Sequence, residues 1–271
     1  MGRCVPALVA GVLLVLVLVA CVSPARRWWG HAAGTGFTAT VVAGGPFRHV
    51  VLEKPGGASR VVHVYLDGDG TPWGTGAPAV DPTPRNMLVL DLMRLDDSPS
   101  VYLGRPCYHG LVDDAGCEPA LWTSERYSDR VVSSMAEGLT RYLSTRQLER
   151  IVFIGYSGGG TLALLLASRF TQTVAVVTVA ANLDIDKWTA HHRYLRLAGS
   201  LNPAAQPPLP PQLYQRHYVG GRDRIVPPDI VTSGRFDRSL VVLVPDFDHT
   251  CCWRRLWPSV LADLLRATGS S

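Results

Sequence analysis

Residues 151–161 read IVFIGYSGGGT, and this stretch decides the fold. Residues 151–154 form a continuous apolar run, as buried strands do, and an apolar helical segment begins near Thr161. Between them, residues 155–159 (GYSGG) match the pattern G-x-S-x-G. A turn this short from strand to helix forces Ser157 into strained dihedral angles and projects its hydroxyl above the sheet. The stretch therefore predicts a strand, a sharp turn that carries a prominent serine, and a helix.

Apolar runs and amphipathic segments alternate on both sides of this turn. We expect strands over residues 60–66, 101–104, 174–179, 213–219 and 240–244, and helices over residues 87–95, 128–143, 161–170 and 253–265. Unbroken apolar strands separated by helices indicate an α/β fold with a mostly parallel central sheet and helices on both faces. Before this region, residues 38–42 and 49–53 flank a Gly-Gly-Pro turn and predict an antiparallel hairpin. Residues 181–211 end in a proline cluster and predict a small insertion without a long regular element.

The composition fits one sizeable domain. The chain has 271 residues, 47% of them hydrophobic, and we place the domain over residues 37–267. The net charge is +4, and the basic residues are scattered along the chain rather than gathered in blocks. Because a nucleic-acid site needs a concentrated basic surface, we expect no nucleic-acid partner.

A serine hydroxyl becomes a useful nucleophile only when a base takes its proton, and a carboxylate should fix the tautomer of that base. Residues 220–227 (GGRDRIVP) follow one late strand, and residues 246–250 (DFDHT) follow the next. These segments offer His249 as the candidate base and Asp223 as the candidate acid.

Other polar residues are weaker candidates. Asp184 and Asp186 follow the expected strand 174–179 and are the alternative source of the acid. We expect Asp246 and Asp248 to be solvated or turn-forming, because neighbours on a loop usually point apart. His63 is expected to be a packed strand residue, and His191 and His192 lie in the insertion.

With these three motifs in order, the chain resembles the α/β-hydrolase superfamily of esterases, lipases and thioesterases over about residues 37–267. In that superfamily the triad residues follow in the order serine, acid, histidine, with the acid in a G-x-x-D-x-x-V-P turn and the histidine in a loop before the last helix. The resemblance therefore implies Asp223 as the acid and His249 as the base that it orients. The resemblance implies a serine hydrolase that forms an acyl-enzyme on Ser157 and acts on a small acyl substrate, a carboxylic ester or thioester. The alternatives are an amidase or peptidase with the same triad, and a lipid-anchored binding protein without turnover. The chemistry requires no metal or organic cofactor.

The resemblance also implies an oxyanion hole made of two backbone N–H groups. One comes from Gly158. The other comes from the turn after residue 66, where relatives carry His-Gly followed by the donor and this chain has Asp67-Gly68-Asp69. We expect Asp69 to be the donor, with Gly70 as the alternative; the carboxylate of Asp69 has to point away from the oxyanion or be hydrogen-bonded.

Two residues near these motifs are candidate substrate contacts. Tyr156 precedes the serine, and Arg105 ends another strand on the same side of the sheet. The alternative for Arg105 is an ion pair with a structural acid.

The N-terminus predicts export. Arg3 is followed by an apolar run over residues 5–20, in the order of a secretory signal. The tetrapeptide 18–21 (LVAC) resembles the lipobox of bacterial lipoproteins, so we expect a signal peptide over residues 1–20, lipidation at Cys21 and a tether over residues 22–36. The predicted location is the cell envelope, anchored to the membrane by lipid and facing the periplasm in a Gram-negative cell. An uncleaved anchor and ordinary cleavage are the alternatives.

Four further cysteines suit an oxidising compartment. We predict a disulfide between Cys107 and Cys117, which would close a short glycine-containing loop. Cys251 and Cys252 are adjacent, and either a vicinal disulfide or two free thiols fits the sequence.

Overall fold

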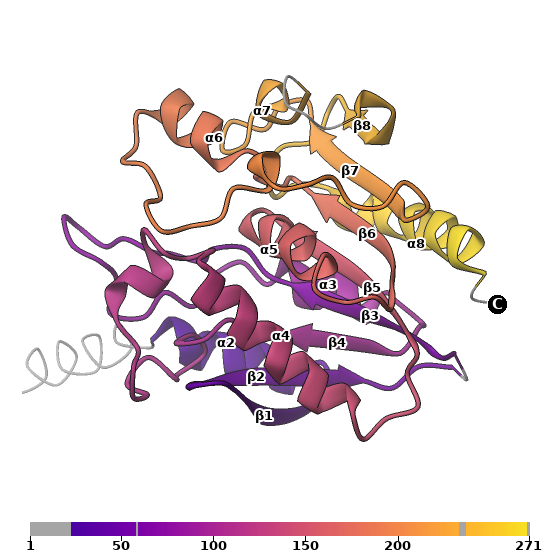
Figure 1. Ribbon diagram of the computed structural model, residues 1–271, viewed down its shortest axis with the longest axis horizontal. Coiled ribbons are helices and arrows are strands. Elements are labelled where there is room, and N and C mark those ends of the chain that lie inside the picture. Colours follow the sequence, from indigo (N-terminus) through magenta and orange to yellow (C-terminus); the bar gives the residue numbers. More distant parts are fainter. Residues whose placement is uncertain (1–22, 58, 233–236, 270–271) are drawn as a thin grey trace, which may run out of the picture.

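The computed structural model describes residues 23–57, 59–232 and 237–269 (Figure 1). Their centre is one eight-stranded sheet in the order β1-β2-β4-β3-β5-β6-β7-β8. The strands are β1 (Thr38–Gly44), β2 (Phe47–Lys54), β3 (Val61–Leu66), β4 (Ser100–Leu103), β5 (Arg150–Tyr156), β6 (Thr173–Val179), β7 (Tyr214–Gly220) and β8 (Val241–Val244). The expected signal peptide and Cys21 lie outside the described residues. Within the part that is described, no helix is long and apolar enough to cross a membrane.

The sheet is mostly parallel, as expected. The hairpin of β1 and β2 is antiparallel, and β2 also pairs antiparallel with β4. All remaining neighbours, from β4 through β3 and β5 to β8, pair in parallel. Parallel neighbours require long crossover connections, and helices supply most of them. The carboxyl ends of these strands therefore lie along one edge, which the arrowheads in Figure 1 mark.

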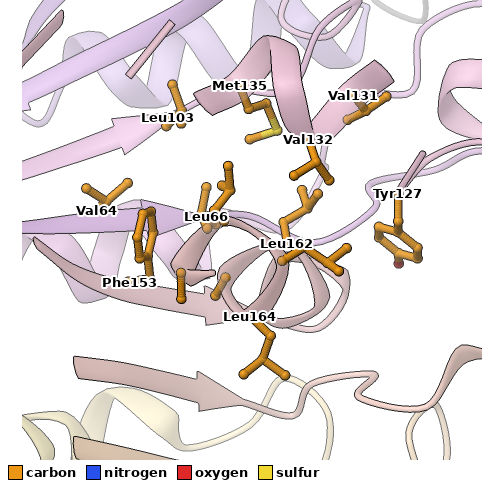
Figure 2. Packing of buried hydrophobic residues seen from close by; sticks show 14 of the residues in the cluster. Val64, Leu66, Leu103, Tyr127, Val131, Val132, Met135, Phe153, Leu162 and Leu164 are labelled. Atoms are coloured by element: carbon orange, nitrogen blue, oxygen red, sulfur yellow. The ribbon is translucent and has the colours of Figure 1, made fainter. Parts of the chain in front are cut away.

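Helices cover both faces of the sheet. They are α2 (Pro24–Ala33), α3 (Leu88–Arg94), α4 (Asp129–Leu143), α5 (Gly158–Ala167), α6 (Ile185–His192), α7 (Pro228–Thr232) and α8 (Trp253–Thr268). Figure 2 shows one face, where Met135 of α4 and Leu162 of α5 pack beside Val64, Leu66 and Phe153 of the central strands. On the other face, α2, α3 and α8 supply buried side chains that pack with those of β3, β4 and β5. The central strands β3, β4 and β5 are buried almost throughout, which explains their unbroken apolar runs.

The expected tether over residues 22–36 is wrong for its central part. Residues 24–33 form α2, whose N–H of Arg26 donates to the Ser23 hydroxyl and whose first residue is proline. Trp28 is fully buried, with its ring 4.0 Å from that of His109 and 5.2 Å from that of Tyr102. Residues 25, 28 and 32 share one buried helical face. Order therefore begins before Phe37, because two tryptophans in ten residues supply enough apolar surface to hold a short helix.

The helix after the serine also begins earlier than expected. The helix after the serine begins at Gly158, three residues before Thr161, because the glycines of the motif form its first turn. A side-chain carbon at Gly160 would lie 2.3 Å from the Cβ of Ala181, so the glycine lets α5 approach the end of β6. The connection from β6 to β7 spans the expected insertion and holds only α6 and one short 3₁₀ turn, Pro203–Ala205.

Both pairs of cysteines form disulfides. Cys107 and Cys117 are bonded, as predicted, and the bond closes the loop between β4 and α4. Cys251 and Cys252 form a vicinal disulfide directly before α8, which decides between the two alternatives that the sequence left open.

Candidate active site

The serine lies on the strained turn that the motif predicts. Ser157 has φ 52° and ψ −124° between the end of β5 and the start of α5. Such a conformation is costly for a residue with a side chain, and it persists only where the surroundings enforce it. A side-chain carbon at Gly155 would lie 2.2 Å from the carbonyl oxygen of Gly159, so the turn requires a glycine there. The hydroxyl of Ser157 is thereby held at the carboxyl edge of the sheet.

Three side chains from distant parts of the chain meet at this edge. The Nε2 atom of His249 lies 3.1 Å from the Oγ atom of Ser157, and its Nδ1 atom lies 2.8 Å from Oδ2 of Asp223. Asp223 is fully buried, and its second oxygen accepts the N–H groups of Ile225 and Val226 at 2.8 Å each. A carboxylate at Nδ1 places the proton there and leaves Nε2 free to accept the serine proton. The structure thus places His249 within hydrogen-bond distance of both Ser157 and Asp223.

The competing carboxylates have other partners. Asp184 caps the N-terminus of α6, and Asp186 pairs with Arg196. Asp246 forms an exposed ion pair with an arginine, and Asp248 accepts the N–H groups of Thr250 and Cys251. None of them contacts His249 through its carboxylate, so the tertiary structure selects Asp223.

A backbone turn crosses above the serine. A side-chain carbon at Gly68 would lie 3.3 Å from Cβ of Ser157, so the segment after β3 passes close to the serine side chain. The N–H of Gly68 donates to the Asp67 side chain, whereas the N–H of Asp69 has no acceptor among the described residues. The N–H of Gly158 is the first of α5 and has no partner inside the helix. The N–H groups of Gly158 and Asp69 fit the expected pair of donors, and the N–H of Gly70, the alternative, also has no acceptor among the described residues.

Comparison with solved structures identifies the fold of the chain. The esterase Pf2001 of Pyrococcus furiosus aligns over 86% of this chain and 91% of its own, with a TM-score of 0.60 and 13% identity. XC6422 of Xanthomonas campestris, an α/β serine hydrolase without a lid, aligns over 85% and 93%, with a TM-score of 0.50 and 14% identity. A bacterial membrane phospholipase A aligns over 96% and 99%, with a TM-score of 0.53 and 15% identity. The chain has the α/β-hydrolase fold. No protein-family model and no curated protein matches the sequence.

In this α/β-hydrolase fold, the carboxylate of Asp69 forms ion pairs with two arginines. It is therefore not an unpaired charge near the serine. It accepts hydrogen bonds from Arg105 Nη2 at 2.8 Å, Arg126 Nη1 at 2.9 Å and the Tyr127 hydroxyl at 2.6 Å. The Tyr108 hydroxyl donates to its backbone carbonyl at 3.0 Å. Burial alone would raise the pKa of Asp69, but the two guanidinium groups outweigh it, so the pKa lies below its usual value.

Both candidate substrate contacts are buried. Arg105 is 5% exposed and pairs with Asp69, which is the structural alternative that we considered from the sequence. Tyr156 is 6% exposed, and its ring lies 5.2 Å from the imidazole of His249. Arg105 therefore supports the turn above the serine, and Tyr156 supports the histidine.

Arg126 and Tyr127, which directly precede the expected helix over residues 128–143, are site residues that the sequence patterns did not indicate. Their partner is 57 and 58 residues earlier in the chain. A carboxylate beside an oxyanion hole needs a cation, and this requirement was the one signal that could have pointed to a second arginine.

The pKa of the neighbouring Asp67 carboxyl group is raised, whereas that of Asp69 is lowered. Burial raises the pKa of Asp67 to about 7, against the hydrogen bond from the Gly68 N–H and the charge of Arg105, which lower it. Asp67 is therefore largely protonated below neutral pH, while Asp69 stays charged.

Several other features are not part of this site. His63 is fully buried, and its Nδ1 lies 2.6 Å from Asp96, as expected for a packed strand histidine. A cavity of about 570 Å³ lies between α5 and the proline-rich segment, and no triad residue lines it. Among residues 23–57, 59–232 and 237–269, no group of three or more histidine, cysteine or acidic side chains could hold a metal ion.

Proposed function

We propose that this chain is a serine hydrolase that cleaves a carboxylic ester or thioester through an acyl-enzyme on Ser157. One observation carries the proposal: the continuous hydrogen-bonded chain from Ser157 through His249 to Asp223, with distances of 3.1 and 2.8 Å. The serine is on a strained turn, the base has its acceptor nitrogen toward the hydroxyl, and the acid is buried. Solved proteins of the same fold that are named as an esterase, a serine hydrolase and a phospholipase A add support.

The first half-reaction forms the acyl-enzyme. The Ser157 oxygen attacks the carbonyl carbon while Nε2 of His249 accepts the hydroxyl proton. The imidazolium that forms is stabilised by the buried carboxylate of Asp223. As the tetrahedral intermediate collapses, His249 gives the proton to the leaving alcohol or thiol, and the acyl group stays on the serine oxygen.

The second half-reaction releases the acid. Water gives a proton to Nε2 of His249 and attacks the acyl carbon, and the same histidine returns the proton to the serine oxygen. In both tetrahedral intermediates the negative oxygen is expected to accept the N–H groups of Gly158 and Asp69. Because Asp69 is paired with two arginines, its carboxylate does not oppose this charge as an unpaired anion would.

Labelling with a fluorophosphonate tests the nucleophile. Wild-type protein should be labelled, and Ser157→Ala should lose the label completely, whereas Ser144→Ala, an exposed serine at the end of α4, should retain it. Asp223→Asn should lower kcat for a short-chain ester by about 10⁴-fold, because the imidazole tautomer is no longer fixed. The matched control Asp246→Asn should leave kcat unchanged.

Two outcomes would contradict the proposal. A folded wild-type protein that the probe does not label would favour a binding protein without turnover. Faster cleavage of aminoacyl amides than of esters and thioesters would favour an amidase or peptidase.

We also propose that Cys21 is lipidated and holds the domain on the envelope membrane. The support is the apolar run over residues 5–20 and the lipobox-like tetrapeptide that ends it. Metabolic labelling with a fatty acid should mark the wild-type protein, and Cys21→Ala should abolish the label. Retention of the label in that variant would refute this assignment.

A further inference from the structure

Large apolar side chains are exposed on segments that contact or directly follow residues of the candidate site; we call the surface between these segments the mouth of the site. On one side Tyr194 is 57%, Leu195 86% and Ile225 52% exposed. These residues are contiguous, because the Trp188 indole N–H donates to the carbonyl of Ile225 at 2.7 Å and the ring of Trp188 lies 5.3 Å from that of Tyr194. The N–H of Ile225 donates to Asp223, so this group directly adjoins the triad.

A second apolar segment directly follows the expected oxyanion turn in the chain. Residues 71–80 read TPWGTGAPAV, begin two residues after Asp69 and carry no charge. Trp73 is 51% and Val80 87% exposed. Figure 1 shows this loop, between β3 and α3, and the segment after α6 at the same end of the sheet, the end to which the arrowheads point. On the surface of a soluble protein, exposed apolar side chains are normally scattered singly. Two groups of them near one site indicate a surface that binds a partner.

Helix α2 contacts the residue that directly follows this second apolar segment. The N–H of Ala25, near the start of α2, donates to the carboxylate of Asp81 at 2.8 Å, and Asp81 directly follows Val80. The described chain therefore begins beside the exposed loop. In the sequence, the apolar run over residues 5–20 ends a few residues before this point.

Cations accompany the apolar groups. Arg85, Arg193 and Arg224 are exposed, and none of them forms an ion pair within the described residues. Arg193 directly precedes Tyr194, and Arg224 directly precedes Ile225. Apolar side chains that enter a bilayer, with arginines beside them at headgroup level, are typical of docking on anionic lipid.

We propose that residues 71–80, Tyr194, Leu195 and Ile225 form one lipid-docking face around the mouth, and that its occupant is a bilayer surface with anionic headgroups. The substrate class that follows is an acyl ester of a membrane lipid, presented to Ser157 from that surface. This inference rests on the proposed hydrolase function and adds the source of the substrate.

The test compares lipid in vesicles with a soluble substrate. The full chain is reconstituted with vesicles of phosphatidylcholine and phosphatidylglycerol, and release of fatty acid is measured beside cleavage of a water-soluble short-chain aryl ester. The triple variant Trp73→Ser, Val80→Ser, Leu195→Ser should lower the ratio of vesicle to soluble hydrolysis at least tenfold. The matched control Val41→Ser, Leu95→Ser removes side chains that are each 45% exposed away from the mouth, and it should leave the ratio unchanged.

A second readout does not depend on turnover. Brominated lipid chains should quench the fluorescence of wild-type protein more than that of Trp73→Phe, and replacing phosphatidylglycerol by phosphatidylcholine should reduce the quenching. Equal quenching in both proteins, or an unchanged ratio in the triple variant, would overturn the docking face. A wild type that cleaves neither substrate but shows Trp73-dependent quenching would instead refute the hydrolase and leave the docking face standing.

Discussion

The charged cluster around Asp69 gives the sharpest prediction. Replacing Asp69 by alanine would leave Arg105 and Arg126, each 5% exposed, buried side by side without the carboxylate that lies 2.8 and 2.9 Å from them. Removing one partner of a buried ion pair typically costs about 3–5 kcal/mol, because the remaining charge stays desolvated. For a chain of this size each kcal/mol lowers Tm by about 2–4 °C, so we expect a fall of roughly 6–20 °C.

The same variant should lose activity beyond its loss of stability. Asp69 also places one of the two expected oxyanion donors, and loss of such a donor lowers kcat by about 10²–10³-fold. Both effects are measured on one preparation, Tm by circular dichroism and kcat on a short-chain ester well below Tm. The control is Asp114→Ala, which removes the carboxylate paired with Arg48, a side chain that is 56% exposed. Exposed pairs contribute about 1 kcal/mol or less.

A double variant tests whether the unpaired arginine charges cause the loss of stability. Asp69→Ala with Arg126→Met removes one of the two stranded cations, so its Tm should fall by less than the sum of the two single changes. If Asp69→Ala melts at the same temperature as Asp114→Ala, the cluster is not the buried network described above. Strict additivity in the double variant would refute the argument in the same way.

Three further predictions concern residues around the fold and the site. Trp28→Ala should cost about 3–5 kcal/mol in urea unfolding, since the ring is fully buried, whereas Trp73→Ala should cost little; equal costs would mean that α2 is not docked. Gly158→Ala should lower kcat at least about 10²-fold, because its Cβ would lie 2.0 Å from Oδ1 of Asp69. An unchanged kcat in this variant would show that the turn moves freely. Burial raises the pKa of Asp67 to about 7, so the folded protein holds a proton that the unfolded chain loses, and stability falls as pH rises from about 4 to 7. Asp67→Asn should lack this fall when unfolding is compared at several pH values; an identical pH dependence in both proteins would contradict the assignment.

Much of the fold follows from local sequence patterns. The run before Ser157, the glycines after it and the alternation of apolar strands with helices predict a parallel sheet, and the structure confirms it. The assignments of His249 and Asp223 also came from their places after late strands, because the carboxyl ends of parallel strands share one edge. Local pattern failed at α2, where arginines and glycines flank a face formed by three residues.

The sequence alone determined which residue types stand at strand ends, and therefore that a serine, a histidine and an acid would share the carboxyl edge. Only the tertiary structure decided which carboxylate meets His249, that Arg105 serves Asp69 instead of a substrate, and that Arg126 joins it. The physical reason is that backbone preferences act between neighbours along the chain, whereas the partner of a buried charge is chosen by distance in space. Asp69 and Arg126 are 57 residues apart, and only the folded sheet brings them into contact.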